Sequence, residues 1–207
     1  MFIVSLKTGT DGALRRMELS DGSLFSFHIC YVPPFIDARY YTPGIEGLEI
    51  SADEASGFRF ASACLRAEKA ALRLITRAEQ TVFGLSRKLE KRGHDAACIG
   101  AVVSRLGEMG LLDDSRYARL WLESRIGRPS SPRRLLAALC ARNINRHDAQ
   151  AALQEVLDDE AEQQLLAHYI RRHFTHIKAA DYRAVRYRLK GEGFSSAAIQ
   201  QYWERDD

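Results

Sequence analysis

The sequence predicts a mainly α-helical fold of tandem three-helix repeats in an extended curved array, preceded by a small N-terminal β-hairpin region. Three features predict this class: a period of fifty residues, apolar residues at helical spacing within each period, and alternation of apolar and polar residues near the N-terminus. The chain has 207 residues, of which 46% are apolar, so it is long enough to bury a core.

The period of fifty appears when three segments are placed under one another. Their sequences are LSRKLEKRGHDAACIGAVVSRL from Leu85, LLAALCARNINRHDAQAALQEV from Leu135 and VRYRLKGEGFSSAAIQQYWERD from Val185. Apolar residues recur in register without a gap, and a turn residue recurs with them as Gly93, Asn143 and Gly193. Chance does not easily lock a turn residue to several apolar positions, so we treat the repeat as real.

Each unit has the pattern of a helix, a turn and a second helix. In the first unit, Leu85 and Leu89 share one helical face. Gly93 follows them as a residue able to take the left-handed conformation that ends a helix. Short polar side chains then suit the N-cap of the second helix, namely Asp95, Asp148, and the pair Ser195 and Ser196.

A third helix is predicted upstream of each pair, from AEKAALRLI, SRYARLWLESRI and AEQQLLAHYIRRHF. In the second of these stretches, the residues with the spacing of a buried face are Tyr117, Leu120, Trp121 and Ser124. The linkers are too short for the bundles to fold back on one another, which favours an extended array. The predicted domains are residues 51–112, 113–158 and 159–207, after an N-terminal region of residues 1–50.

The N-terminal region predicts strands rather than helices. The stretches FIVSLK and RRMELSDGSLFSFHI alternate apolar with polar residues, and Asp21-Gly22 is a strong hairpin turn signal. Ser51 and Glu54 then form a capping box for the first long helix. A lone hairpin is marginally stable in water, so we expect it to dock on that helix.

The basic residues are mostly arginine and are unevenly placed. Of the 30 basic residues, 24 are arginine, whose planar fork suits phosphate and carboxylate partners. Six arginines and no acid lie between Ser124 and His147, and seven basic residues face one acid from Arg171 to Lys190. Two successive basic blocks favour a polyanion or an acidic protein surface as the partner, and solvated helix faces are the alternative.

Several classes of protein are not expected. No run of 18 apolar residues and no signal peptide is present, which predicts a cytoplasmic protein without a membrane partner. No phosphate-binding glycine loop occurs, and no catalytic constellation is evident, so we expect no enzyme activity. Arginines beside His168, His173 and His176 oppose a cation, so neither a metal nor a cofactor is expected. The single cysteines suit buried thiols in a reducing compartment: Cys30, Cys64, Cys98 and Cys140.

The octet LLDDSRYA, from Leu111 to Ala118, places two acids side by side. Asp113 and Asp114 are open to two interpretations. They could belong to a carboxylate pair for metal-assisted cleavage, which needs a third acid and convergent geometry. Alternatively, they cap a helix that starts near Ser115. Adjacent side chains at a helix start usually point apart, so capping is favoured.

At this joint the sequence resembles the RecX family of bacterial recombinase regulators. The resemblance rests on GLLDDSRYA, followed by Trp121 and Arg125, on RKLEKRG before it and on PRRLLAALCARNI after it, and it covers about Leu72 to Trp203. It implies tandem three-helix repeats and a non-enzymatic regulator that binds RecA and its nucleoprotein filament. Inhibition of ATP hydrolysis and strand exchange is implied, in homologous recombination, DNA repair and the SOS response.

The resemblance also implies site residues and shows departures. It places the basic position of repeat one on Lys88, that of repeat two on Arg133 and Arg134, and the inter-repeat joint on Asp113, Asp114, Arg116 and Tyr117. With the basic blocks added, the surface expected to bind RecA and the DNA filament comprises Arg87, Lys88, Arg92, Arg125, Arg128, Arg133, Arg134, Arg142, Arg183, Arg186, Arg188 and Lys190. Departures from the family pattern are Thr81 in place of serine, Gly84 in place of an acid, and Asn143 in place of glycine.

The alternative function is a DNA-binding transcription regulator of helix-turn-helix type. Three-helix units with a basic second or third helix are the usual form of that class. An evident two-fold dimer element is absent from the sequence, which counts against it, and we expect a monomer. Binding to single- or double-stranded DNA alone should be weak, non-specific and steeply salt-dependent, because contacts to phosphates behave in this way.

Overall fold

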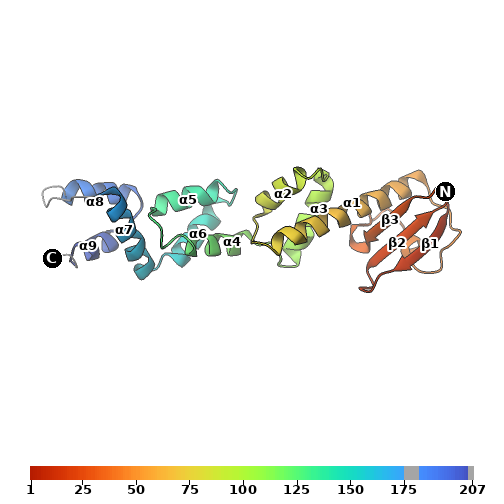
Figure 1. Ribbon diagram of the computed structural model, residues 1–207, viewed down its shortest axis with the longest axis horizontal. Coiled ribbons are helices and arrows are strands. Elements are labelled where there is room, and N and C mark those ends of the chain that lie inside the picture. The colour runs from red at the N-terminus through yellow and green to blue at the C-terminus, as the bar shows by residue number, and fades with distance from the viewer. Residues whose placement is uncertain (175–181, 205–207) are drawn as a thin grey trace. The chain divides into compact units, whose positions relative to one another are not determined.

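The computed structural model describes residues 1–174 and 182–204, which form helices and one small sheet (Figure 1). The predicted fold class, mainly α-helical with a small N-terminal β region, is confirmed. By internal contacts the chain divides into two compact units, Met1–Leu112 and Asp113–Asp207. The extended curved array and the four domain ranges stay predictions.

Unit 1 begins with an antiparallel sheet of strand order β1-β2-β3, formed by β1 (Ile3–Thr8), β2 (Leu14–Leu19) and β3 (Leu24–His28). The Asp21-Gly22 turn joins β2 to β3 as predicted, with Gly22 at φ 82°. Two short 3-10 helices, Ile29–Tyr31 and Ala38–Tyr41, lead to α1 (Ala52–Ile75), α2 (Val82–Glu90) and α3 (Ala96–Glu108). The predicted hairpin is therefore part of a three-stranded sheet.

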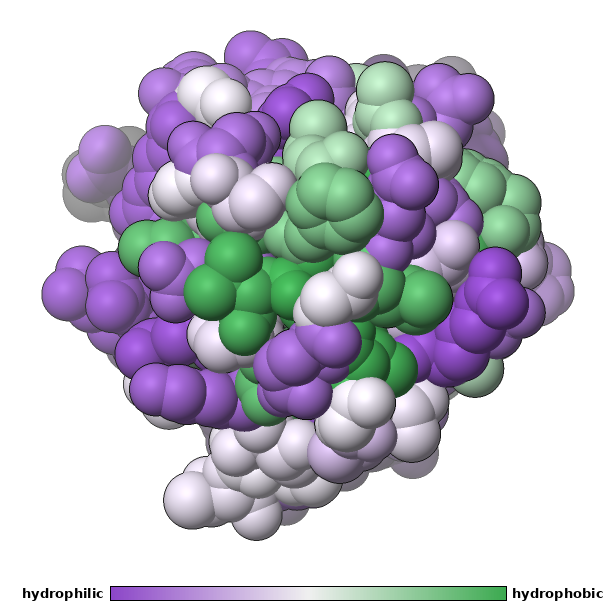
Figure 2. All heavy atoms as spheres, turned by 90° about the vertical axis from the view of Figure 1, so that its right-hand side faces the viewer, coloured by the Kyte–Doolittle hydropathy of each residue, from purple (hydrophilic) through white to green (hydrophobic). Residues whose placement is uncertain are grey.

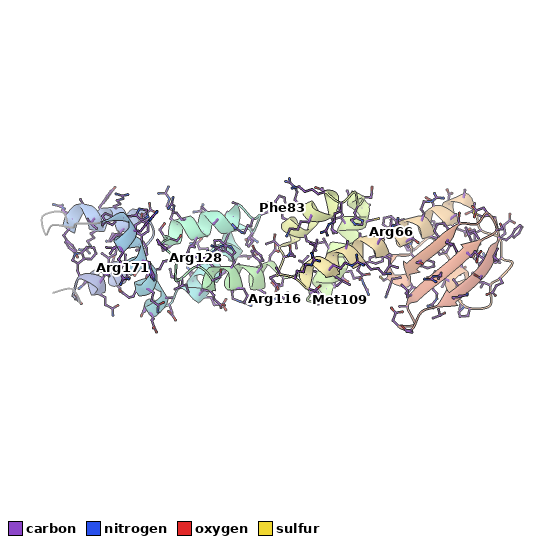
Figure 3. The ribbon with its side chains drawn as sticks, viewed as in Figure 1. Arg66, Phe83, Met109, Arg116, Arg128 and Arg171 are labelled. Carbon is purple, nitrogen blue, oxygen red and sulfur yellow. The ribbon has the colours of Figure 1, made fainter. Side chains whose placement is uncertain are left out.

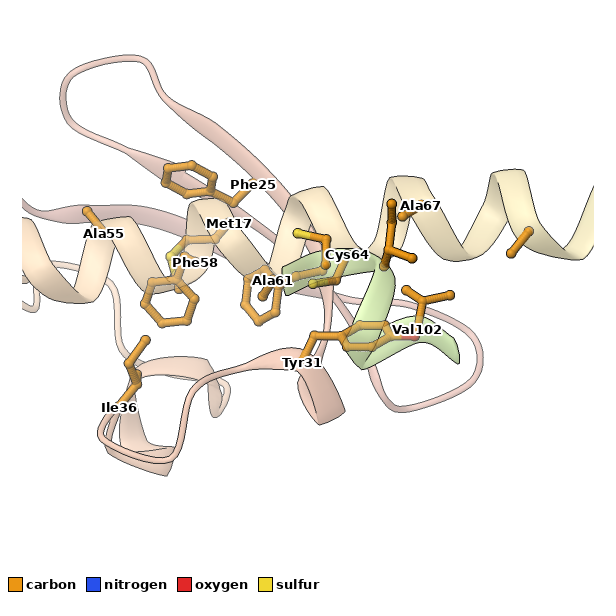
Figure 4. Close-up of a cluster of buried hydrophobic side chains, with 14 of the residues drawn as sticks. Met17, Phe25, Tyr31, Ile36, Ala55, Phe58, Ala61, Cys64, Ala67 and Val102 are labelled. Atoms are coloured by element: carbon orange, nitrogen blue, oxygen red, sulfur yellow. The ribbon is translucent and has the colours of Figure 1, made fainter. Parts of the chain in front are cut away.

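The sheet docks on α1, as predicted, and shares one hydrophobic core with the first repeat. Met17 and Phe25 of the sheet and Phe58 of α1 belong to the buried cluster drawn in Figure 4. The rings of Phe27 and Phe58 have centroids 5.0 Å apart. The capping box is confirmed, because the Ser51 N–H donates to Glu54 Oε2 at 2.7 Å and the Glu54 N–H donates to Ser51 Oγ at 3.2 Å.

The sheet end of unit 1 also carries exposed apolar side chains. Figure 2 shows an apolar group there within a polar surround. The large apolar residues exposed in the first fifty positions are Met1, Phe2, Val4, Leu24 and Phe35. Along the described part of the chain, no helix has the length and apolar character needed to cross a membrane.

The described part of unit 2 contains helices joined by turns. Its elements are α4 (Asp114–Glu123), α5 (Pro132–Cys140), α6 (Arg146–Val156), α7 (Asp159–His173), α8 (Tyr182–Gly191) and α9 (Ser196–Glu204). One core of buried side chains runs through all six helices, so the second and third repeats are packed as one body. Pro132 begins α5, where its missing N–H costs nothing.

Two glutamates, Glu192 and Glu162, form hydrogen bonds between elements of unit 2. The Ser131 hydroxyl donates to Glu192 Oε2 at 2.6 Å, and the Arg133 N–H donates to the Glu192 carbonyl at 3.0 Å. Within the third repeat, Glu162 accepts hydrogen bonds from the Ser195 N–H at 2.6 Å and the Ser195 hydroxyl at 2.7 Å. Residues outside the helices thus contribute to the packing of unit 2.

The turn residues of the fifty-residue period all have positive φ. The angles are 79° at Gly93, 64° at Asn143 and 92° at Gly193. In each repeat the next N–H donates back to the carbonyl of the second buried leucine, at 3.2 Å from His94 to Leu89, 3.3 Å from Ile144 to Leu139 and 3.2 Å from Phe194 to Leu189. These bonds close the helix end as a Schellman motif does. The predicted repeat is confirmed in backbone geometry.

Gly84, a departure from the family pattern, lies in the first turn of α2 beside the N-cap. Thr81 caps α2 by accepting a hydrogen bond from the Gly84 N–H at 2.9 Å. A Cβ on Gly84 would lie 2.9 Å from Thr81 Oγ1, closer than real Cβ contacts allow. Glycine at this position therefore leaves room for the threonine cap.

Some predicted roles are wrong in detail. Asp95 caps α3 as expected, but α6 is capped by Asn145 and not by Asp148, which lies in its first turn. The buried face of α4 is formed by Ala118 and Leu122, whereas Leu120 is 48% exposed. The pattern was ambiguous because three apolar residues, Leu120, Trp121 and Leu122, follow one another in that helix. Of the cysteines, Cys64 and Cys98 are buried as expected, and Cys30 and Cys140 are exposed.

Asp113, rather than Asp114, is the N-cap of α4. Its carboxylate accepts hydrogen bonds from the Ser115 N–H at 2.9 Å and the Arg116 N–H at 3.0 Å. We expect Asp113→Ala to lower the free energy of unfolding by about 1 kcal/mol, as the loss of an N-cap does. Urea denaturation measures this. Ser115→Ala is the control and should change stability by less than about 0.5 kcal/mol.

The Asp113 cap also predicts a pH dependence. Hydrogen bonds from the backbone, first that of Arg116 and then that of Ser115, lower the pKa of Asp113. Because the folded-state pKa lies below the unfolded value of about 3.9, the cap stabilises fully above that value and is lost as the pH falls through the folded-state pKa. The stability difference between the protein and Asp113→Ala should shrink there. A difference that stayed constant down to that pH would contradict the cap.

The left-handed turn gives a pair of opposite predictions. Asn143→Gly should raise the free energy of unfolding by about 0.5 kcal/mol, because glycine adopts positive φ without strain. Gly193→Ala should lower it by about 1 kcal/mol or more, because its φ is 92° and the added Cβ would lie 3.4 Å from the Arg133 backbone N. Thermal denaturation measures both changes. Shifts in the same direction would show that φ does not control these turns.

Candidate functional site

The basic residues expected to form a binding surface fall in both units. Arg87, Lys88 and Arg92 lie in unit 1, and the other nine lie in unit 2. Each group is described within its own unit. Figure 3 shows Arg66 and Phe83 in unit 1 and Arg128 and Arg171 in unit 2.

In unit 1, two of the three expected residues have local partners. The Arg87 guanidinium lies over the ring of Phe83, with its carbon 5.8 Å from the ring centroid. The Lys88 Nζ donates to Gln80 Oε1 at 2.6 Å, so this lysine also fastens the segment before α2. Phe83 is 40% exposed, which leaves the arginine and the ring accessible together.

Arg92 borders a hollow that the sequence pattern did not predict. Arg73, near the C-terminal end of α1, and Arg77, just after that helix, line the same hollow of about 320 Å³, with Ala70 and Leu74 beside them. The missed signal was present in the sequence, because Arg66, Lys69, Arg73 and Arg77 follow one another at helical spacing. The basic row on α1 was missed because the later basic blocks are denser in arginine.

In unit 2, Arg125 and Arg142 meet at Trp121. The guanidinium carbon of Arg125 lies 5.0 Å from the indole centroid, and that of Arg142 lies 4.5 Å from it. Arg142 Nη1 also donates to the Ala138 carbonyl at 2.6 Å. The Arg125 Nε is buried and has no hydrogen-bond partner among the described residues. Trp121 was expected in the core, and it is half-buried, with its ring packed against the core and against both arginines.

Arg133 and Arg134 lie in the first turn of α5. Both side chains are exposed. Their backbone groups have structural roles, since the Arg133 N–H donates to the Glu192 carbonyl and the Arg134 N–H donates to Ser131 Oγ at 3.3 Å. The side chains are therefore separate from the contacts that hold the repeats together.

The basic residues of α8 share one helix but not one environment. Arg188 lies over the ring of Phe174, with its guanidinium carbon 5.1 Å from the centroid. Arg183 and Lys190 are exposed, and Arg186 is half-buried. Exposed Arg128 follows α4, before the α5 N-cap. The expected set thus forms several local clusters within unit 2.

The joint residues have structural roles. Asp113 caps α4, Asp114 is the first residue of that helix, and Tyr117 is half-buried against the core of unit 2. The Arg116 N–H completes the cap. Both hydrogen bonds that the Asp113 side chain accepts come from backbone amides, which fits capping and gives no support to a carboxylate pair for cleavage.

His176, considered above as a possible ligand with His168 and His173, lies outside the described residues. Within the part of the chain that the structure describes, no group of three or more His, Cys, Asp or Glu side chains is arranged to hold a metal ion.

Two family profiles match the chain. The first three-helix domain of RecX matches residues 67–106, and the second three-helix domain of RecX matches residues 113–153. The regulatory protein RecX of Treponema pallidum strain Nichols is 37% identical over 107 residues, which are 51% of this chain and 65% of the relative. The chain therefore covers just under two thirds of that relative. The regulatory protein RecX of Thermus thermophilus is 36% identical over 133 residues, or 64% of this chain and 87% of the relative.

Solved structures share the fold. A crystal structure of a regulatory protein RecX has a TM-score of 0.70 with 17% identity, and the likeness covers 98% of both chains. RecX from Lactobacillus salivarius has a TM-score of 0.56 with 19% identity, over 70% of this chain and 97% of that chain. The matched three-helix domains, and the Thermus relative of which the chain covers 87%, show that this chain belongs to the RecX family.

Proposed function

We propose that this chain is a non-enzymatic regulator that binds RecA and its nucleoprotein filament and inhibits ATP hydrolysis and strand exchange. Membership of the RecX family supports the proposal. It acts in the cytoplasm as a monomer, in homologous recombination, DNA repair and the SOS response. A filament of protein on DNA presents both carboxylates and phosphates, and arginine forks bind either group.

The observation that carries the proposal is the cluster of Arg125, Trp121 and Arg142. Two guanidinium groups lie within 5.0 Å of one indole centroid, and none of the ion pairs found among the described residues involves either of them. Like charges repel, so such a pair is more stable when an anion lies nearby. The cluster is thus suited to an anionic partner, and Arg128, Arg133 and Arg134 add exposed charge in the same unit.

The proposed surface gives a direct prediction. Arg133→Glu combined with Arg134→Glu should abolish inhibition when the protein is titrated into RecA filaments on single-stranded DNA and ATP turnover is followed. The substitutions reverse two exposed charges. The Arg133 contact between repeats uses its backbone N–H, so folding should be retained, and circular dichroism checks this.

The matched control reverses the same number of charges elsewhere. Lys7 and Arg16 are exposed cross-strand neighbours in the sheet, and Lys7→Glu with Arg16→Glu should leave inhibition intact. Unchanged inhibition by the Arg133 and Arg134 variant would remove these residues from the surface. No effect of the unsubstituted protein on ATP turnover at saturation would favour the helix-turn-helix transcription regulator.

A further inference from the structure

We propose that repeats 1 and 2 each carry a phosphate-binding site beside the arginine of the helix-ending turn, Arg92 in the first and Arg142 in the second. Together with a basic row on α1, these sites bind the sugar–phosphate backbone of nucleic acid. These residues are the ones that contact DNA in the proposed function. We infer the nature of the biological partner from that function, and the rest from the positions of the arginines.

The row consists of Arg66, Lys69 and Arg73 on α1 and of Arg77, two residues after the end of that helix, all exposed. Spacings of three and four residues place the three helical members within one face of α1. At a rise of 1.5 Å per residue, the helical part of the row is roughly 10 Å long. A row of this kind follows an extended polyanion better than it matches a single charge.

Beyond its first turn, α1 carries a single acidic residue. From Ala55 to Arg77 the only acid is Glu68. Glu68 is 7% exposed, and its Oε1 accepts a hydrogen bond from Arg105 Nε at 3.1 Å, so it is buried and paired. None of the ion pairs found in residues 1–174 and 182–204 includes a member of the row or Arg92. Most solvated helix faces mix charges of both signs, and this face does not.

A second element, the turn after α2, lies beside the hollow at the end of the row. Arg92 comes from the turn after α2 and lines the hollow with Arg73 and Arg77. The turn is fixed by Gly93 at φ 79° and by the bond from the His94 N–H to the Leu89 carbonyl. Three arginine side chains therefore border a hollow of about 320 Å³.

The second repeat repeats this arrangement. Arg142 stands fifty residues after Arg92, just before its own left-handed turn residue. It reaches the first helix of its repeat, where it stacks on Trp121, as Arg125 does. The Arg125 Nε is buried without a hydrogen-bond partner among the described residues, and none of the ion pairs found there involves Arg125. In each of the first two repeats, the arginine before the turn therefore has another arginine nearby.

The arrangement of the arginines favours a chain of phosphates over a single carboxylate. A carboxylate is satisfied by a single arginine fork in bidentate geometry. A backbone phosphate binds such a fork in the same way, but it is joined to neighbouring phosphates, which suits a cluster of three arginines continued by a row. The third repeat has Glu192 at the equivalent position, bonded to Ser131, so it carries no such site.

The test is a fluorescence anisotropy titration of a labelled single-stranded oligonucleotide with the full chain, over a range of salt concentrations and without RecA. Arg73→Ala with Arg92→Ala should reduce the slope of log affinity against log salt by about 1.4, because each lost phosphate contact removes about 0.7. Arg73→Lys with Arg92→Lys keeps the charge and should retain most of the slope. Lys7→Ala with Arg16→Ala is the control of equal charge and should leave the slope unchanged.

Three results would overturn the site. The alanine variant could bind like the control, the lysine variant could lose as much slope as the alanine variant, or poly-glutamate of equal charge could displace the oligonucleotide as well as unlabelled DNA does. The last result would assign the surface to an acidic protein. Because RecA is absent, failure here leaves the titration of RecA ATP turnover as a separate test of the proposed function.

Discussion

The helix-ending turn is the constraint on which the rest of this molecule depends. In each repeat a residue at positive φ, Gly93, Asn143 or Gly193, lets the next N–H return to the carbonyl of a buried leucine. That bond fixes the direction of the following helix relative to the core, because the leucine cannot move without leaving its packed site. The turn also fixes the position of the residue just before it, which is Arg92, Arg142 or Glu192. Local backbone geometry thereby decides where charge is presented.

The three repeats of the sequence are packed into two hydrophobic cores. The first repeat buries its apolar face together with the sheet, and the second and third repeats bury theirs together. Each arrangement solves the problem that one short helical unit cannot cover its own apolar face. Glu192 stabilises the second arrangement, because its carboxylate accepts a hydrogen bond from Ser131 of the preceding repeat. Glu162 stabilises the third repeat itself, because it accepts hydrogen bonds from the hydroxyl and the N–H of Ser195, which would otherwise lose water without compensation.

The sequence predicted the local features that depend on residue type and spacing. The fifty-residue period, the left-handed turn at Asn143, the capping box at Ser51 and the docking of the sheet on α1 all follow from such rules, and the structure contains them. The predicted buried face of α4 was wrong in part: Tyr117 and Trp121 pack against the core, but Leu120 is exposed and Leu122 is buried, and only tertiary contacts choose between two leucines. The meeting of Arg92 with Arg73 and Arg77 joins separate elements, so no local pattern revealed it.

Glu192 also limits how the repeats can be exchanged. Its carboxylate meets Ser131 of the preceding repeat, whereas the same position in the other two repeats holds an arginine. A chimera with the first repeat grafted in place of the third would bring a guanidinium to the Ser131 hydroxyl and lose the acceptor. The first repeat could therefore not replace the third without the loss of a hydrogen bond to the repeat before it.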